Sequence, residues 1–143
     1  MTRPESADSA PAPGVDVYRR LMGEHGHYQE ILNELNPQHR ALRAAIPEVY
    51  QGFNALSKAA FAPGALDTKT KELIALAIGV VDECDGCIAS HARSAVRAGA
   101  SRQEAAEAIG VAFLMQGGPA TIYGSRAYTA FCEFADAEEQ RDR

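Results

Sequence analysis

The stretch that decides the fold is residues 68–91, which read TKTKELIALAIGVVDECDGCIASH. Its first part, residues 68–81, is apolar on nearly every side of a helix, and such a helix has to be buried on all faces. The acidic pair at residues 82–83 interrupts this pattern. A second helix is expected to begin near Cys84 and to end at Gly99, a residue typical of helix ends. The stretch therefore predicts a buried helix that is followed directly by a helix beginning with cysteines.

Two helical stretches are predicted ahead of it. Apolar residues fall at mostly helical spacing over residues 15–34, and Pro37 is expected to end that helix, because the residue before a proline avoids helical conformation. A second helical pattern covers residues 38–60, where Pro47 predicts a break or a kink. Residues 1–14 are rich in proline, alanine and serine, and are expected to form a disordered tail.

Two further helices are predicted after it. Ser101 and Glu104 have the spacing of a capping box, which marks a helix start. Pro119 suits the first position of a last helix that runs to about Ala137. No run alternates apolar and polar residues with β-branched side chains, so no strand is predicted. The expected architecture is all-α, with about six helices in a single domain over residues 15–138.

Composition and charge narrow the class of protein. The chain has 143 residues, of which 46% are hydrophobic and 23% charged, as in ordinary globular domains. A formal net charge of −5 weighs against nucleic acid or an anionic membrane as the main partner. No apolar run approaches the ~20 residues of a membrane-spanning helix, and no secretory signal is seen. Three cysteines, with two close in sequence, suit a functional pair in the reducing cytoplasm.

Two of the predicted helices, the one over residues 68–81 and the one that starts after Ser101, are apolar nearly all round. A chain of 15.3 kDa has few surfaces with which to cover two such helices. Part of their surface is therefore expected to be covered by another subunit, which predicts a homo-oligomer.

The strongest chemical signal is the pair Cys84 and Cys87 at a predicted helix start. Three residues apart in the first turn, the two sulfurs lie on one face and can reach disulfide distance. The positive end of the helix favours a thiolate, which is the nucleophilic form of cysteine. His91 follows one turn after Cys87 on the same face, where a neutral imidazole could take the thiol proton. These residues predict a thiol oxidoreductase.

Some neighbouring residues oppose or exclude particular chemistries. Asp82, Glu83 and Asp85 surround the pair with negative charge, which raises thiol pKa values unless these side chains point to solvent. Attachment of haem is excluded, because Ile88 stands where a histidine would have to follow the second cysteine.

Zinc and a purely structural role are the remaining alternatives. Structural zinc needs four ligands, and the motif supplies three, so that Cys132, His39 or Glu72 would have to complete the set. Two buried cysteines beside a core histidine would also account for the pattern without chemistry. No metal and no cofactor are expected.

The other cysteine and the other histidines are predicted to be core or surface residues rather than residues of the site. Cys132 lies in an apolar helical segment and is expected to be a small core residue. His25, His27 and His39 fall in polar surroundings and are expected on the surface.

Several motifs together resemble the AhpD-like/carboxymuconolactone decarboxylase family. They are KELIALA at residues 71–77, CxxCIASH at 84–91, AGAS at 98–101 and GGPA at 117–120, with Tyr123 further along. The resemblance covers about residues 66–134. It implies the helical AhpD-like fold and an assembly of three or six subunits.

The resemblance also implies a proton relay and a peroxidase cycle. AhpD proteins have a relay glutamate twelve residues before the first cysteine, where this chain has Glu72; by itself, Glu72 would be taken for a solvated residue near a helix start. His91, oriented by Glu72, would deprotonate Cys87, whose thiolate would attack a hydroperoxide. Cys84 would then close the disulfide. A dithiol donor, which is a lipoylated protein in the AhpD family, would reduce it again.

The chain departs from the best-studied AhpD members at one position. They have a histidine between the cysteines where this chain has Gly86, a change expected to lower peroxidase activity. The decarboxylase branch of the family typically lacks the cysteine pair, so the pair counts against γ-carboxymuconolactone decarboxylation. That lyase activity and a non-catalytic, redox- or metal-responsive oligomer remain the alternative functions.

Overall fold

The computed structural model describes residues 26–143, which form six α-helices and no strand. The helices are α2 (His27–Ala45), α3 (Pro47–Phe61), α4 (Thr68–Val81), α5 (Asp85–Arg97), α6 (Arg102–Gln116) and α7 (Gly118–Arg141). The prediction of an all-α fold is confirmed. The predicted disordered tail and the beginning of the first predicted helix lie outside the described residues.

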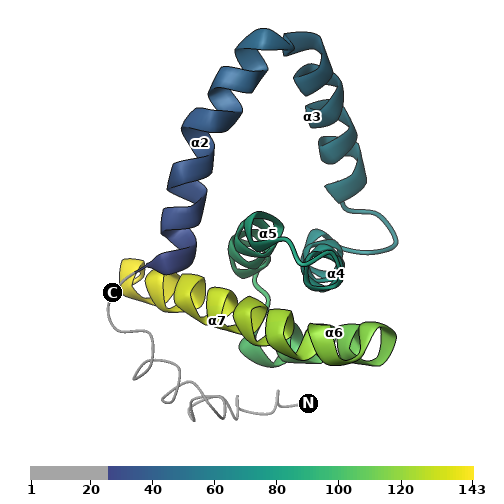
Figure 1. Cartoon of the computed structure of the whole chain (residues 1–143). Helices are drawn as coiled ribbons and strands as arrows, with labels where there is room; N and C mark the ends of the chain where they lie inside the picture. The colour runs from purple at the N-terminus through teal and green to yellow at the C-terminus, as the bar shows by residue number, and fades with distance from the viewer. Residues whose placement is uncertain (1–25) are drawn as a thin grey trace, which may run out of the picture.

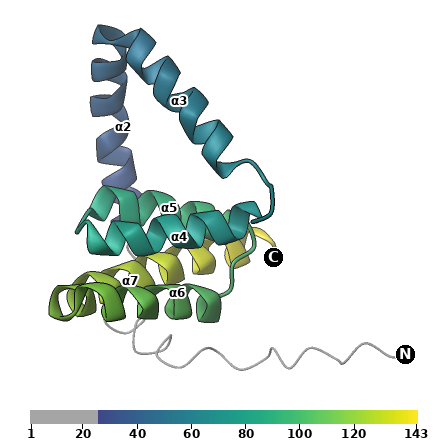
Figure 2. The same cartoon turned by 90° about the vertical axis from the view of Figure 1, so that its right-hand side faces the viewer.

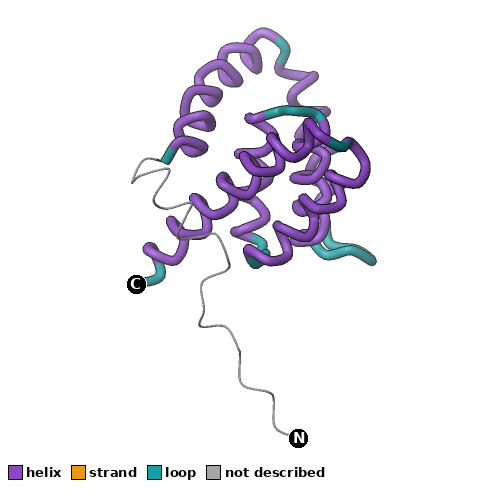
Figure 3. The backbone as a smooth tube through the Cα atoms, turned by 60° about the horizontal axis from the view of Figure 1, so that its bottom comes forward, coloured by secondary structure: helices purple, strands orange, loops and turns teal. Residues whose placement is uncertain are grey.

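The six helices divide into two parts. Helices α4, α5, α6 and α7 pack against one another and are called the base. Helices α2 and α3 rise from it, converge, and meet at their far ends; they are called the arch (Figures 1 and 2). One foot of the arch, the start of α2, contacts α5 and α7. The other foot leads from α3 into α4 through a short loop (Figure 3).

The hydrophobic core lies in the base. Its largest fully buried side chains include Leu76 on α4, Ile88 on α5 and Phe131 on α7. Alanines on α5, α6 and α7 let the helices approach closely, and Gly124 goes further, since a β-carbon there would lie 2.8 Å from Ile109 Cγ2. Helix α2 adds two buried residues at its foot, and α3 adds none.

The helix ends predicted from local sequence are confirmed in the base. Ser101 and Glu104 form the complete capping box at the start of α6. Gly99 follows the end of α5 with φ +87°, a left-handed conformation that glycine adopts at little cost. These signals act within a few residues, so the surrounding fold does not alter them.

The prediction that Pro37 ends its helix is wrong, because α2 continues through it to Ala45. Proline removes one backbone donor and leaves the carbonyl of Asn33 without its helical partner. Both residues are exposed, so water can reach that carbonyl. The break occurs instead at Ile46, directly before Pro47, as the second proline predicts.

The start of α2 is capped from the base. Gly26 precedes the helix and offers no capping side chain, but the amides of Tyr28 and Gln29 donate to the carboxylate of Glu133 on α7, at 3.1 and 2.9 Å. An acceptor with negative charge suits the positive end of a helix. This contact joins the arch to the base. None of the helices in residues 26–143 is long and apolar enough to cross a lipid bilayer.

Candidate active site

A tight turn between α4 and α5 places the first cysteine. The amide of Glu83 donates to the carbonyl of Val80, and the amide of Cys84 donates to the carbonyl of Gly79, at 3.2 and 3.1 Å. This pair of bonds closes a Schellman motif, in which glycine normally takes the left-handed position. Here Glu83 takes it, with φ +55°. The chain therefore reverses within three residues and brings Cys84 to the start of α5.

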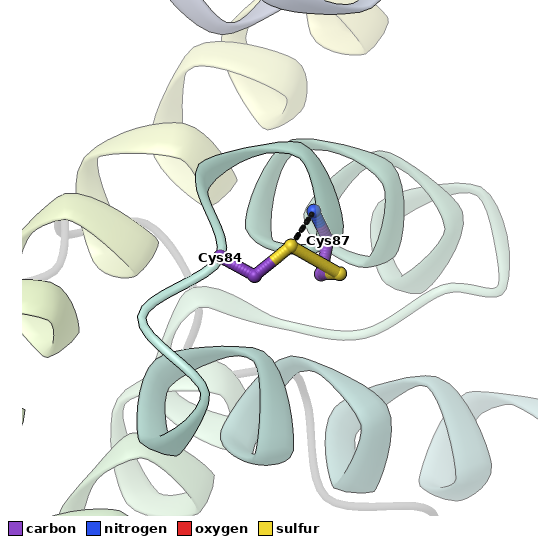
Figure 4. The surroundings of a disulfide bond; sticks show 2 residues. All are labelled: Cys84 and Cys87. Atoms are coloured by element: carbon purple, nitrogen blue, oxygen red, sulfur yellow. Dashed lines mark hydrogen bonds between the residues drawn. A yellow bond between two sulfur atoms is a disulfide. The ribbon is translucent and has the colours of Figure 1, made fainter. Parts of the chain in front are cut away.

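The two cysteines lie together in the first turn of α5. Their Cα atoms are 5.2 Å apart and their sulfurs are joined as a disulfide (Figure 4). The Sγ of Cys84 also acts as the helix cap, since it accepts a hydrogen bond of 3.2 Å from the amide of Cys87. Amide donors at a helix start stabilise negative charge on sulfur. The prediction that the pair reaches disulfide distance is confirmed.

Exposure distinguishes the two sulfur-bearing residues. Cys87 is exposed, whereas Cys84 is half-buried between the turn and the helix. Cys87 is therefore the more accessible residue of the pair.

The structure brings Glu72 and His91 together from neighbouring helices. The Nδ1 of His91 lies 2.8 Å from Oε2 of Glu72, which is the one buried charged residue of the described chain and is 8% exposed. Phe61 stacks on the imidazole with ring centroids 5.6 Å apart. In the tautomer whose Nδ1–H donates to Glu72, Nε2 is left as an acceptor.

The acidic residues around the pair are partly neutralised. Asp85 pairs with Arg126 on α7 at 3.3 Å, while Asp82 and Glu83 are exposed to solvent. Water screens the charge of the two exposed carboxylates, and the arginine offsets that of the third. Arg126 was not predicted as a neighbour of the cysteines, because a partner 41 residues away leaves no local signal.

Gly86 allows the arch to rest on the active-site helix. A β-carbon at this position would lie 3.0 Å from Cδ1 of Leu35 on α2. The absence of a side chain between the cysteines thus has a structural reason in this chain: α2 occupies the space that a larger residue would need.

An open cleft of about 1240 Å³ lies between the arch and α5. It is lined by both cysteines and His91 from the base and by residues of α2 and α3 from the arch. Three of the four predicted site residues therefore border solvent-accessible space, while Glu72 lies behind His91 and does not line the cleft. The arch residues that line it were not predicted, because no local pattern shows which helix will stand above the cysteines.

Among the remaining candidates, His39 lines the cleft from α2, whereas Cys132 and His27 lie outside it. Cys132 is fully buried in the core, as predicted, and burial raises the pKa of its thiol. His27 and His39 are exposed, as predicted, and His39 lies 3.2 Å from the hydroxyl of Tyr50, while His25 falls outside the described residues. Within residues 26–143, no three histidine, cysteine or acidic side chains are grouped closely enough to hold a metal ion.

The chain is an all-helical protein with a cysteine pair at a helix start, and comparison with known proteins identifies its family. The chain belongs to the carboxymuconolactone decarboxylase family, whose sequence model matches residues 47–130, more than half of the chain. The resemblance inferred from the motifs is confirmed.

Individual relatives agree with this assignment. A carboxymuconolactone decarboxylase family protein from Legionella pneumophila, solved without ligand, is 40% identical, with a TM-score of 0.75 over 78% of this chain and 99% of that one. A family protein from Thermotoga maritima, with a suggested involvement in antioxidative response, is 35% identical, with a TM-score of 0.59 over 64% and 94%. An uncharacterized protein from Cupriavidus necator is 39% identical over 70% of this chain and 88% of its own.

Proposed function

We propose that this family member is a thiol-dependent peroxidase that reduces hydroperoxides through Cys84 and Cys87. The observation that carries the proposal is the coincidence, at one cleft, of a cysteine pair at disulfide distance and a histidine bonded to a buried carboxylate. A nucleophile, a base and a group that orients the base are the parts that activate a thiol.

The buried carboxylate orients the base that takes the thiol proton. Glu72 accepts the Nδ1–H bond and holds the imidazole of His91, with Phe61 stacked on the ring. The Nε2 atom of His91 then takes the proton of the Cys87 thiol, directly or through water. Cys87 is the attacking residue because it is the exposed member of the pair.

The redox step balances with two thiols and one hydroperoxide. The Cys87 thiolate attacks the terminal oxygen, the O–O bond breaks, and the leaving alkoxide takes the proton held by His91 to become an alcohol. Cys87 is left as a sulfenic acid. Cys84 attacks that sulfur, water leaves, and the disulfide forms. The hydroperoxide gains two electrons, and the two cysteines supply them.

A dithiol closes the cycle by exchange with the disulfide. Attack of one donor thiolate on the exposed sulfur of Cys87 forms a mixed disulfide, and the second donor thiol releases the reduced enzyme. A lipoylated protein is the proposed donor, and the reducing cytoplasm is the proposed location, since dithiol donors are kept reduced there.

Thiol titration with and without hydroperoxide tests the proposal. Reduced protein should lose two thiols per hydroperoxide, Cys87→Ser should consume none, and Cys84→Ser should stop after one turnover. Cys132→Ser is the matched control, because its thiol is buried outside the cleft. Intact thiols after peroxide treatment, with carbon dioxide release from γ-carboxymuconolactone surviving alkylation of both cysteines, would contradict the peroxidase and support the lyase.

We also propose that the protein is a homo-oligomer, a trimer or a hexamer, in which a second copy covers the outer face of the base. Eight large apolar side chains of α4, α6 and α7 are exposed in the single chain: Ile74, Ile78, Val81, Val111, Phe113, Leu114, Met115 and Ile122. Monomeric proteins seldom leave such a set uncovered. Light scattering should give the mass of the assembly, and Leu114→Glu should reduce it while Gln103→Glu, on the same helix, should not.

A further inference from the structure

The cleft above the cysteines has an apolar wall that the peroxidase reaction itself does not require. Ile31 and Leu35 of α2 line the cleft on one side, and Phe53, Leu56 and Phe61 of α3 line it on the other. Leu32 also borders the cleft, but it belongs to the hydrophobic core. Phe53 and Leu56 are each 64% exposed, so these side chains are available to a ligand rather than buried in the core. A small hydroperoxide would leave most of this wall uncovered.

The same cleft is rich in positive charge. Arg40 and Arg43 of α2 and Arg93 of α5 line it, and Glu34 is the one carboxylate among its lining residues. The chain as a whole has a net charge of −5, so this excess of cations is a local feature. A cleft lined mainly by one sign of charge attracts ligands of the opposite sign.

The arginines of the cleft also differ from others in the chain. Arg102 pairs with Asp136 and Glu139, and Arg126 pairs with Asp85. Within residues 26–143, no ion pair or hydrogen bond to a carboxylate involves the three arginines of the cleft.

Arg93 is the most constrained of the three cleft arginines. It is half-buried, its Nε is enclosed without a hydrogen-bond partner, and burial together with the neighbouring Arg97 lowers its pKa. Because this guanidinium lines the cleft, an anionic ligand there would offset its partly desolvated charge.

We propose that the substrate of this cleft is an amphiphilic hydroperoxide with a carboxylate at one end, such as a fatty-acid hydroperoxide. The carboxylate binds the arginines, the hydrocarbon chain covers the wall beneath the arch, and the peroxide group reaches Cys87. The products are the corresponding hydroxy acid, water and the Cys84–Cys87 disulfide. This proposal rests on the peroxidase function and names its substrate class.

Single-turnover oxidation of the reduced protein tests the preference for a hydroperoxide that has a carboxylate. Linoleic acid hydroperoxide and its methyl ester differ only in charge, and the absence of a donor removes any effect of donor docking. We expect the acid to react at least about tenfold faster, as two or three charge-assisted bonds allow. The ratio of the two rate constants should fall towards one in Arg93→Gln and in the double variant Arg40→Gln/Arg43→Gln. Lys58→Gln, an exposed cation of α3 outside the cleft, should keep the ratio.

Binding without turnover separates this proposal from the peroxidase proposal. Calorimetry with the Cys84→Ser/Cys87→Ser variant should show decanoate binding and no binding of methyl decanoate, with decanoate weakened about tenfold or more by Arg93→Gln. Equal rates for acid and ester, with no decanoate binding, would overturn the substrate class and leave the peroxidase intact. Decanoate binding in a protein that oxidises no thiol with any hydroperoxide would instead overturn the peroxidase. If the arginine substitutions changed only the turnover with a protein donor, that result would also overturn the proposed substrate class. It would indicate that the arginines bind the donor.

Discussion

The base and the arch are both helical, yet different forces hold them. In the base, Phe131 is fully buried and α5 contributes four buried residues, whereas α3 of the arch contributes none and Phe53 is 64% exposed. Packing therefore fixes the base, while the arch depends on its two feet and on the Glu133 cap of α2. The packed base can therefore hold side chains at fixed positions, whereas the arch leaves its side chains open to contact with other molecules.

The candidate catalytic residues and the other residues of the cleft are divided between the base and the arch in the same way. Glu72, His91 and both cysteines belong to the base, where close packing can hold a hydrogen bond of 2.8 Å. The apolar wall and two of the three arginines of the cleft belong to the arch. On this view the base performs the reaction and the arch selects the substrate, and substitutions in the two parts should have different effects.

The largest expected effect is on the reaction of the base. His91→Ala should slow the oxidation of the cysteine pair by hydroperoxide about 10²- to 10⁴-fold, the usual contribution of a general base. Stopped-flow measurement of thiol loss gives the rate. His27→Ala, an exposed histidine of the arch outside the cleft, should react like the wild type. A wild-type rate in His91→Ala would remove the imidazole from the mechanism.

Removal of a phenyl ring should lower stability much more in the base than in the arch. Phe131→Ala in the base should lower the free energy of unfolding by about 3–5 kcal/mol, and the milder Phe131→Leu should serve if the first variant does not fold. Phe53→Ala in the arch should lower it by less than about 0.5 kcal/mol, as at exposed positions. Urea denaturation measures both. An equal and concentration-dependent loss in Phe53→Ala would show instead that another subunit covers the arch.

The contact between the two parts can be tested at Gly86. Gly86→His introduces the side chain found in the best-studied AhpD proteins and should cost about 1–3 kcal/mol of stability, because it forces Leu35 and α2 away from α5. Adding Leu35→Ala should recover part of that loss. Gly86→Ala should be nearly neutral, since the flexible end of Leu35 can shift and alanine favours the helix. No destabilisation in Gly86→His would show that α2 does not rest on this position.

The smallest expected effect is a gain of stability at the turn of the base. Glu83→Gly should raise the free energy of unfolding by roughly 0.5–1 kcal/mol. The left-handed conformation costs about 1–2 kcal/mol for a residue other than glycine, and glycine removes this cost. Part of the gain is offset because glycine loses more conformational entropy on folding. Asp82→Gly is the matched control: its φ of −79° is right-handed, so glycine should destabilise there. Thermal unfolding of the two variants should shift in opposite directions.

Local signals in the sequence predicted most of the base. The capping box of Ser101 and Glu104 and the glycine after α5 act within one or two turns, and the structure confirms them. The helix predicted over 68–81 is also present, but it is not buried on all faces within the single chain, because Ile74 and Ile78 are exposed. The same kind of signal failed at Pro37, because a solvent-exposed position tolerates the lost hydrogen bond.

The sequence by itself determined the all-helical class, the cysteine pair in the first turn of a helix, and the histidine one turn later, since all three follow from spacing along the chain. The contact of Glu72 with His91 was expected only from the family resemblance, and the structure contains it. Three further contacts across helices were not expected from the sequence: Asp85 with Arg126, Glu133 with the start of α2, and the arginines of the arch with the cleft of the cysteines. Hydrophobic packing sets the positions of the helices, and because the hydrophobic effect is non-directional, a local sequence pattern does not show which helices will be neighbours. Contacts between distant residues become visible only when that packing is known.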